Sequence, residues 1–262
     1  MSRSLFVVSV ALAGLLLGSF ANVLIARVPA GEDWVRGSSH CPRCRHDLAW
    51  YDNIPLFSWM WLRRRCRYCR EPISARYPVV ESLVALLFGA IAIESGATLA
   101  TAALGYLAVI SVALVYIDAD VQRLPDSIVL PAYPIVAALL LGDAALQGEW
   151  GSVARAGLGL AIMGGFYGLM WLAYPAGLGL GDIKSAGLLG MVLGYLSWGQ
   201  LAVGAIAGPL LGGVWVIVGL ATRRLKRTSR VPYGPALFGG AWLGVLAGSA
   251  IASSYVALLT SG

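Results

Sequence analysis

Residues 98–118 read TLATAALGYLAVISVALVYID, an apolar run that ends on the carboxylate of Asp118. A run of this length predicts a helix that crosses a lipid bilayer, because about 20 residues at a rise of about 1.5 Å span the hydrocarbon core. A carboxylate beside hydrocarbon is costly, so an acid at the rim of such a helix is a candidate functional residue. The stretch therefore predicts both a membrane fold and one residue of its site.

The composition of the whole chain agrees with a membrane protein. Of its 262 residues, 58% are hydrophobic and 12% are charged, and the mean hydropathy is +0.76. Soluble domains carry about 25% charged residues. We predict an all-α polytopic membrane protein with about eight transmembrane helices, the first of them retained rather than cleaved as a signal peptide. The predicted spans are 4–26, 78–94, 98–117, 127–142, 153–174, 183–197, 200–221 and 236–258.

Several of the 33 glycines recur every four residues, a spacing that lets the backbones of membrane helices approach each other. The series are Gly190–Gly194, Gly204–Gly208–Gly212 and Gly244–Gly248. We predict that these glycines pack one helix against another.

The net charge of +6 comes from cations that cluster on one side of the predicted spans. Nine of the 19 Lys and Arg residues lie between Arg36 and Arg76, and five more lie in 223–230. The alternate loops, which carry no cation, are 94–98, 142–152 and 197–200. This asymmetry predicts that the basic segments, and with them Asp118 and Asp182, face the cytoplasm. The partner we expect for these cations is the lipid bilayer, and we expect no nucleic acid.

All four cysteines lie in the one long polar segment, 29–77, as Cys41-Pro42-Arg43-Cys44 and Cys66-Arg67-Tyr68-Cys69. Two C-x-x-C motifs separated by 21 residues are typical of a tetrahedral zinc site, and four thiolates leave no open position for catalysis. A segment this small also needs a staple, because its apolar core is limited. We predict a cytoplasmic Cys₄ zinc-knuckle insert with the ligands Cys41, Cys44, Cys66 and Cys69.

Two other uses of the cysteines are open to the sequence. Disulfide pairing is disfavoured by a reducing cytoplasm, and a thioredoxin-like motif lacks its βαβ surroundings. His40 and His46 flank the first motif and are interpreted as surface residues. The aromatic stretch between the motifs, 48–61, is a candidate for the insert's core, for the bilayer interface or for a partner contact, and the interface is favoured.

A second acid, Asp182, closes the Gly-rich run Gly177-Leu178-Gly179-Leu180-Gly181-Asp182. Two carboxylates brought within a few ångström share a proton, because both cannot ionise cheaply. One then acts as general base on a water and the other as general acid, although the roles cannot be assigned to single residues. Gly179 and Gly181 are expected to make room for the backbone of an extended substrate.

Asp120 and Asp126 are alternatives to Asp118 as the acid that pairs with Asp182. Asp126 follows Pro125 at the predicted start of a helix, where N-capping is the expected role. Asp120 is expected to support the site or to be solvated. Lys184 is interpreted as a residue that sets orientation. Asp118 is preferred because it ends an apolar span directly.

Five segments in this order carry a resemblance to a known family. They are GSFANV at 18–23, WYDNIP at 50–55, ISARYPVVE at 73–81, IDADVQRLPD at 117–126 and GLGDIK at 179–184. Together they resemble the type IV prepilin peptidases, the GxGD aspartic proteases of the membrane. The resemblance implies the domains 1–28 (first transmembrane helix), 29–77 (Cys₄ insert) and 78–262 (helical peptidase domain).

The resemblance implies that Asp118 and Asp182 are the catalytic residues of a prepilin peptidase in the bacterial inner membrane. Its substrates would be prepilins or pseudopilins of type IV pili or type II secretion, cut at the cytoplasmic face. Many members also methylate the new N-terminus with S-adenosylmethionine. This chain carries Arg64 where relatives commonly have Gly, so the methyltransferase activity depends on what that glycine does.

Two other classes of function fit parts of the sequence. Buried acids are also found in proton-coupled transporters, but these often contain internal repeats, and the two halves of this chain show none. A non-catalytic membrane assembly factor built around the zinc insert would leave the two acids unexplained.

Overall fold

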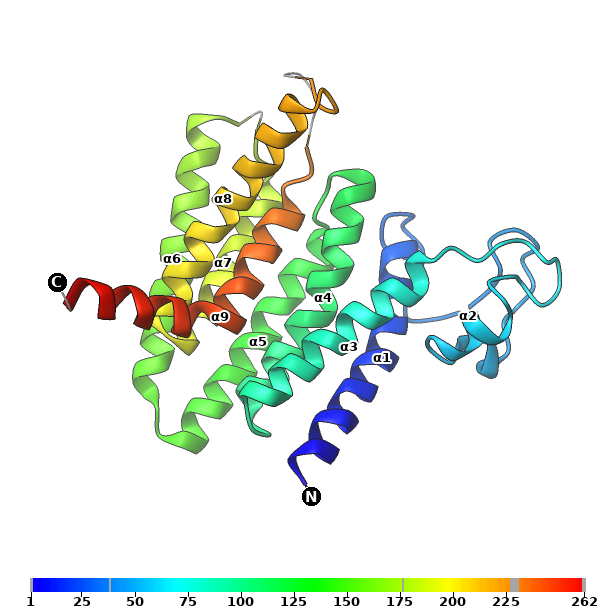
Figure 1. The fold of residues 1–262 in the computed structure, drawn as a ribbon, viewed down its shortest axis with the longest axis horizontal. Helices are drawn as coiled ribbons and strands as arrows, with labels where there is room; N and C mark the ends of the chain where they lie inside the picture. Colours follow the sequence, from blue (N-terminus) through cyan, green and yellow to red (C-terminus); the bar gives the residue numbers. More distant parts are fainter. Residues whose placement is uncertain (1, 38, 176, 227–230, 261–262) are drawn as a thin grey trace. The chain divides into compact units, whose positions relative to one another are not determined.

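The computed structural model describes residues 2–37, 39–175, 177–226 and 231–260, and within these ranges it contains helices and no strand. Part of the basic run 223–230 falls outside these ranges. The helices, labelled in Figure 1, are α1 (Arg3–Arg27), η1 (Trp50–Asn53), α2 (Phe57–Trp61), α3 (Arg76–Glu94), α4 (Leu99–Val121), α5 (Asp126–Gln147), α6 (Trp150–Ala173), α7 (Leu180–Leu196), α8 (Trp198–Ala221) and α9 (Gly234–Thr260).

The predicted all-α polytopic membrane fold is confirmed. Each of the eight predicted spans corresponds to one long helix, and seven of these are long and apolar enough to cross a membrane. The remaining one, α7, has 17 residues and is buried along most of its length. The end of α4 lies beyond the predicted span, at Val121, so Asp118 lies inside the last turns of the helix.

The chain divides into two compact units. They comprise Met1–Ala97 with Leu104–Ala113, and Thr98–Ala103 with Leu114–Gly262, so that α4 contributes to both. In the first unit, α1 and α3 lie side by side (Figure 1). A Cβ at Gly18 would lie 2.7 Å from the Cα of Glu81, so the absence of a side chain permits this close approach. The amide of Asn22 donates to the carbonyl of Tyr77 at 3.2 Å and joins the same two helices.

The insert between α1 and α3 is built from η1, α2 and two short knuckles. It is joined to α3 by the backbone N–H of Leu56, which donates to the Glu81 carboxylate at 2.8 Å. Trp50 and Trp61 are 79% and 70% exposed, so these two aromatics are not core residues of the insert. The bilayer interface and a partner contact remain as predictions for them.

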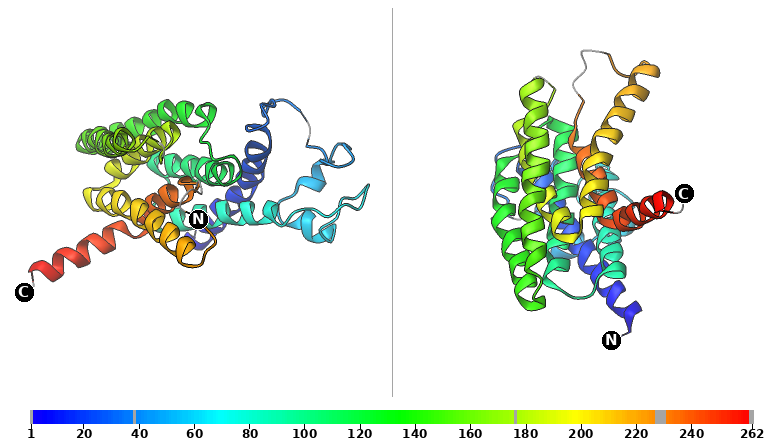
Figure 2. Two further views of the ribbon diagram at one scale, coloured as in Figure 1. Left: turned by 90° about the horizontal axis from the view of Figure 1, so that it is seen from above. Right: turned by 90° about the vertical axis from the view of Figure 1, so that its left-hand side faces the viewer.

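In the second unit, α7 lies among α5, α6, α8 and α9, while α8 runs beside α9 (Figure 2). The predicted role of the glycines is confirmed here. A Cβ at Gly194 would lie 3.1 Å from the Cα of Gly159 in α6, and one at Gly244 would lie 2.9 Å from the Cα of Gly204 in α8. The helices therefore meet backbone to backbone, as small residues allow in membranes.

Candidate active site

Asp118 lies at the end of α4 and is buried, with 5% of its surface exposed. Its Oδ2 accepts a hydrogen bond of 2.7 Å from the backbone N–H of Gly234, the first residue of α9. That N–H has no partner within its own helix, and the positive end of the helix dipole favours a carboxylate there. A Cβ at Gly234 would lie 2.7 Å from the same Oδ2, so this position requires glycine.

Asp182 lies in the first turn of α7 and is 8% exposed. Its Oδ2 accepts a hydrogen bond of 2.8 Å from the N–H of Gly179, and its own N–H donates to the Gly179 carbonyl at 3.1 Å. The pair of bonds resembles a capping box, with the acid reaching back to the residue before the helix. The carboxylate is thereby fixed by its own segment.

The structure brings the two predicted acids together. Asp118 lies near the end of α4 and Asp182 in the first turn of α7, and both helices belong to the second unit. The two segments also touch, because a Cβ at Gly181 would lie 2.9 Å from both the carbonyl oxygen and the Cβ of Leu124. Within the described ranges, the Oδ1 atoms of both acids have no hydrogen-bond partner.

The contact at Gly181 changes the interpretation of the glycines. Gly181 was expected to leave space for a substrate backbone, but Leu124 already occupies that side. The glycine instead allows the start of α7 to pack against the segment that follows Asp118. This contact gives a physical reason for a glycine directly before the acid in the GxGD motif.

Asp126 and Lys184 play a different part from the predicted one. Asp126 is the first residue of α5 and makes no capping bond; its carboxylate oxygens accept two bonds from Lys184 Nζ, at 2.7 and 2.8 Å. The prediction of an N-cap at Asp126 is therefore wrong, and Lys184 does more than set orientation. The ion pair joins the two acid-bearing segments. Asp120, by contrast, is exposed.

Two tyrosines beside the acids were missed by the sequence analysis. The Tyr167 side chain, from α6, is fully buried, and its hydroxyl lies 2.9 Å from the hydroxyl of Tyr233. Tyr233 directly precedes Gly234, whose N–H donates to Asp118. A tyrosine inside an apolar span is a weak sequence signal, because the partner of its hydroxyl lies 66 residues away in the chain.

The four cysteines form a second site, in the insert. One ligand atom from each lies within 4.8 Å of the others, and the sulfurs of Cys41 and Cys69 are 3.8 Å apart. A tetrahedron with metal–sulfur bonds of about 2.3 Å has edges of about 3.8 Å, so the cluster is able to bind a metal such as zinc. Neither His40 nor His46 belongs to this cluster.

The two knuckles have the same local structure. In the first, the N–H of Cys41 donates to His46 and its carbonyl accepts from Arg45. In the second, Cys66, Glu71 and Arg70 repeat these bonds, and both arginines have positive φ, 58° and 62°. A hydrogen bond from the backbone N–H of Cys44 lowers the pKa of Cys41 to about 7, which favours the thiolate that a metal needs.

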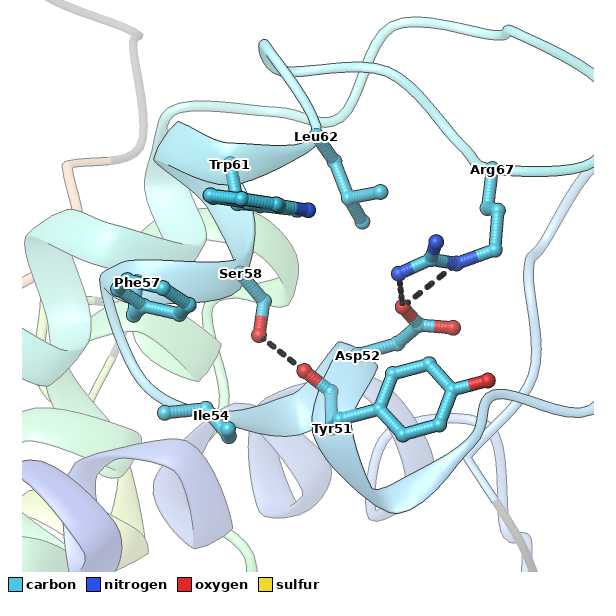
Figure 3. A pocket seen from close by; sticks show the side chains of 8 residues that line it. All are labelled: Tyr51, Asp52, Ile54, Phe57, Ser58, Trp61, Leu62 and Arg67. Carbon is cyan, nitrogen blue, oxygen red and sulfur yellow. Dashed lines mark hydrogen bonds and ion pairs between the residues drawn. The ribbon is translucent and has the colours of Figure 1, made fainter.

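The insert also contains a small pocket of about 100 Å³ (Figure 3). It is lined by Tyr51, Asp52, Ile54, Phe57, Ser58, Trp61, Leu62 and Arg67. Arg67 donates from Nε and Nη2 to one oxygen of Asp52, at 3.0 and 2.7 Å, and this bond raises the pKa of Arg67. The Ser58 hydroxyl donates to the carbonyl of Tyr51 at 2.7 Å.

The fold is that of a polytopic membrane protein, with two buried acids near the end of α4 and at the start of α7. Two family models match the chain: the Bacterial Peptidase A24 N-terminal domain over residues 12–95, and the Type IV leader peptidase family over residues 105–217. The chain belongs to the type IV leader peptidase family. Asp118 and Asp182 both lie in the second matched region.

Curated relatives agree with this family. A protein of Aeromonas hydrophila is 34% identical, over 92% of this chain and 91% of its own length. Proteins of Myxococcus xanthus and Pseudomonas aeruginosa are 39% and 31% identical, over 88% and 96% of this chain and 70% and 93% of their own lengths. All three are named prepilin leader peptidase/N-methyltransferase. No solved structure matches the chain.

Proposed function

We propose that this chain is an aspartyl endopeptidase that removes the leader of type IV prepilins or pseudopilins at the cytoplasmic face of the bacterial inner membrane. The observation that carries the proposal is the pair of buried acids, Asp118 and Asp182, each with one oxygen bonded to a backbone N–H at a helix start. The remaining oxygens are available to a water and to the scissile carbonyl. Family membership supplies the class of substrate.

In this mechanism the two acids share one proton. The ionised carboxylate takes a proton from a water, whose oxygen attacks the scissile carbonyl carbon, while the protonated acid donates a hydrogen bond to the carbonyl oxygen. Breakdown of the tetrahedral intermediate breaks the C–N bond, and a proton passes from an acid to the leaving amine. The bonds from Gly179 and Gly234 keep the carboxylates in place through both steps.

The topology of the substrate supports the same site. Prepilins carry a short basic leader in the cytoplasm, followed by an apolar helix in the membrane, so the cut must be made at the membrane rim. Positive loops predict that the ends of α4 and α7 bearing Asp118 and Asp182 lie on that side. The division into 1–28, 29–77 and 78–262 is proposed on the same basis.

Replacement of either acid by asparagine tests the peptidase. Asp118→Asn and Asp182→Asn should lower leader removal at least about 10³-fold, because the amide cannot act as a base. The readout is mass spectrometry of the N-terminus of a co-expressed prepilin, and the matched control is Asp120→Asn in the same helix. Cleavage at the wild-type rate by either of the first two variants would refute the proposal.

We also propose that the Cys₄ cluster binds zinc as a structural metal. The donors are four thiols, and the S···S distance of 3.8 Å between Cys41 and Cys69 equals the edge of a zinc–thiolate tetrahedron, about 3.8 Å. When bound, zinc would tie the two knuckles together. With all four positions filled, the site would hold no water for catalysis.

Methyl transfer is a second proposed activity, supported by the names of the relatives. Arg64 lies in the left-handed region with φ +62°, a conformation that glycine adopts at no cost. The glycine that the family resemblance implies at this position would therefore suit the backbone, and Arg64 does not line the pocket of the insert. That pocket, at about 100 Å³, would accept only one end of S-adenosylmethionine, since ligand pockets usually measure about 300–1,000 Å³.

Two measurements test methyl transfer. The same mass spectrometry should find the mature pilin heavier by one methyl group, and calorimetry should detect binding of S-adenosylmethionine by the purified protein. Mature pilin without the methyl group, in cells that supply the donor, would exclude the activity for this chain.

A further inference from the structure

In the second unit, the fully buried Tyr167 and the half-buried Tyr233 bond to each other. Their hydroxyls are 2.9 Å apart, and their ring centroids are 5.8 Å apart with the planes inclined by 55°. A buried phenol without a partner loses the hydrogen bond it would make to water, so each hydroxyl satisfies the other. Phenylalanine would fill the same space in an apolar interior, so packing alone does not require the two hydroxyls.

The helix next to the pair leaves a fitted space for it. A Cβ at Gly208 of α8 would lie 3.0 Å from the hydroxyl oxygen of Tyr167. One at Gly212, a turn later, would lie 2.9 Å from the ring of Tyr233. The two tyrosines are therefore held closely on the side of α8, and their hydrogen bond fixes them against each other.

The pair connects to the acid site through the start of α9. The carbonyl of Tyr233 accepts from Ala236 and Leu237 at 3.1 and 3.0 Å, so α9 begins on this residue. The next residue, Gly234, donates its N–H to Asp118. The Tyr233 carbonyl and the Gly234 N–H belong to one planar peptide group, so holding Tyr233 also holds the direction of the Gly234 N–H.

We propose that Tyr167 and Tyr233 form a positioning pair for the acid site. The bond between them anchors the start of α9, so that Gly234 holds Oδ2 of Asp118 and leaves Oδ1 directed to the reacting water. The tyrosines contact each other rather than the reacting atoms, so they act through Asp118. The inference rests on the proposed peptidase function and adds two residues to its site.

Removing either hydroxyl should slow the reaction without weakening substrate binding. For Tyr167→Phe and Tyr233→Phe we expect kcat to fall about tenfold, with KM within about twofold, because a misplaced group can cost up to about 10²-fold. The pH–rate profile should shift in both, since the environment of the acids changes. The double variant should be no slower than the slower single variant, because either change breaks the same bond.

Tyr255→Phe is the matched control, since this tyrosine is 63% exposed near the far end of α9. It should keep the wild-type kcat and pH profile. If one tyrosine variant fails to accumulate in the membrane, the other still tests the pair, because each alone breaks the bond. Size-exclusion profiles and thermal unfolding in detergent confirm that the variants are folded.

Two results would overturn the proposal: wild-type kcat and pH profile in both single variants, or losses that multiply in the double variant. The outcome is distinguishable from a failure of the peptidase function. If Asp182→Asn is inactive while the tyrosine variants are fully active, only the positioning pair is refuted. If Asp182→Asn still cleaves, the peptidase assignment itself fails.

Discussion

The acid site and the cysteine cluster are held in place by opposite means. Asp118 and Asp182 are fixed by backbone N–H groups at helix starts and by glycines that let helices approach. The cysteines lie in a segment with two short helices, where tight turns and one metal-sized cluster take the place of a core. In lipid the backbone must satisfy itself and can supply the donors, whereas a small segment in water needs a staple.

The largest expected effect tests whether the insert, unlike the acid site, depends on a metal. Metal removal by a chelator, or the change Cys66→Ser, should unfold the insert, because structural zinc contributes about 10–16 kcal/mol in small zinc domains. Hydrogen exchange with mass spectrometry should show loss of protection in 39–72 and no change in α5–α9. Equal loss in both regions would mean that the metal stabilises the whole chain. Retained protection in 39–72 would contradict a structural metal.

The next largest effect tests whether the acid site depends on its backbone donor at Gly234. Gly234→Ala places a methyl group 2.7 Å from Oδ2 of Asp118, so the carboxylate must move, and kcat should fall about 10²-fold. Gly239→Ala in the same helix is the control, because its Cβ would make an ordinary contact of 3.6 Å with Leu211. Leader-cleavage kinetics in reconstituted membranes provide the measurement. Equal activity of the two variants would show that catalysis does not require the contact between Gly234 and Asp118.

A smaller change sharpens the description of the insert. Arg64→Gly relieves a left-handed residue, worth about 1–2 kcal/mol, and removes the stacking of Arg64 on Trp59, worth about 0.5–1 kcal/mol at an exposed site. The insert should therefore become more stable by up to about 1 kcal/mol, seen as a higher chelator concentration for metal release. Arg65 has no positive φ, so Arg65→Gly relieves no strain and should lower the stability of the insert. The same sign in both variants would exclude backbone strain at Arg64.

The smallest effect concerns the ion pair between the acid-bearing segments. Lys184→Ala should lower stability by about 0.2–1 kcal/mol, because the pair is partly exposed and screened by water. A double-mutant cycle with Asp126→Ala, followed by thermal unfolding in detergent, measures the coupling. A coupling energy near zero would show that the pair does not hold the two segments together.

The sequence was sufficient to predict what depends on local pattern. Apolar length predicted the helices, motif spacing predicted the cysteine cluster, and the position of Asp118 at the end of an apolar run marked it as a candidate site residue. The end of α4 was missed, because Asp118 and Asp120 continue the helix after the apolar pattern has stopped. A hydropathy pattern has no information on a helix beyond its apolar part.

The missing parts of the site depend on long-range contacts. Gly234 lies 116 residues from Asp118, and Lys184 lies 58 residues from Asp126. No local sequence pattern shows which distant residue a glycine or a lysine contacts. A backbone N–H is present in every residue except proline, so its role as a donor leaves no trace in the sequence. The role of Gly181 was also missed, because its close neighbour is Leu124 on another segment.

The burial of α7 on nearly every side has a consequence for how this protein can vary. Leu210 and Ile217 of α8 are 61% and 67% exposed, so on a helix that crosses a membrane they should accept most apolar side chains. Leu188 and Leu189 of α7 are fully buried, and the helix packs against α5, α6, α8 and α9. A saturation library should therefore retain few substitutions along α7 and many along α8, and we expect α7 to change more slowly than α8 in descent.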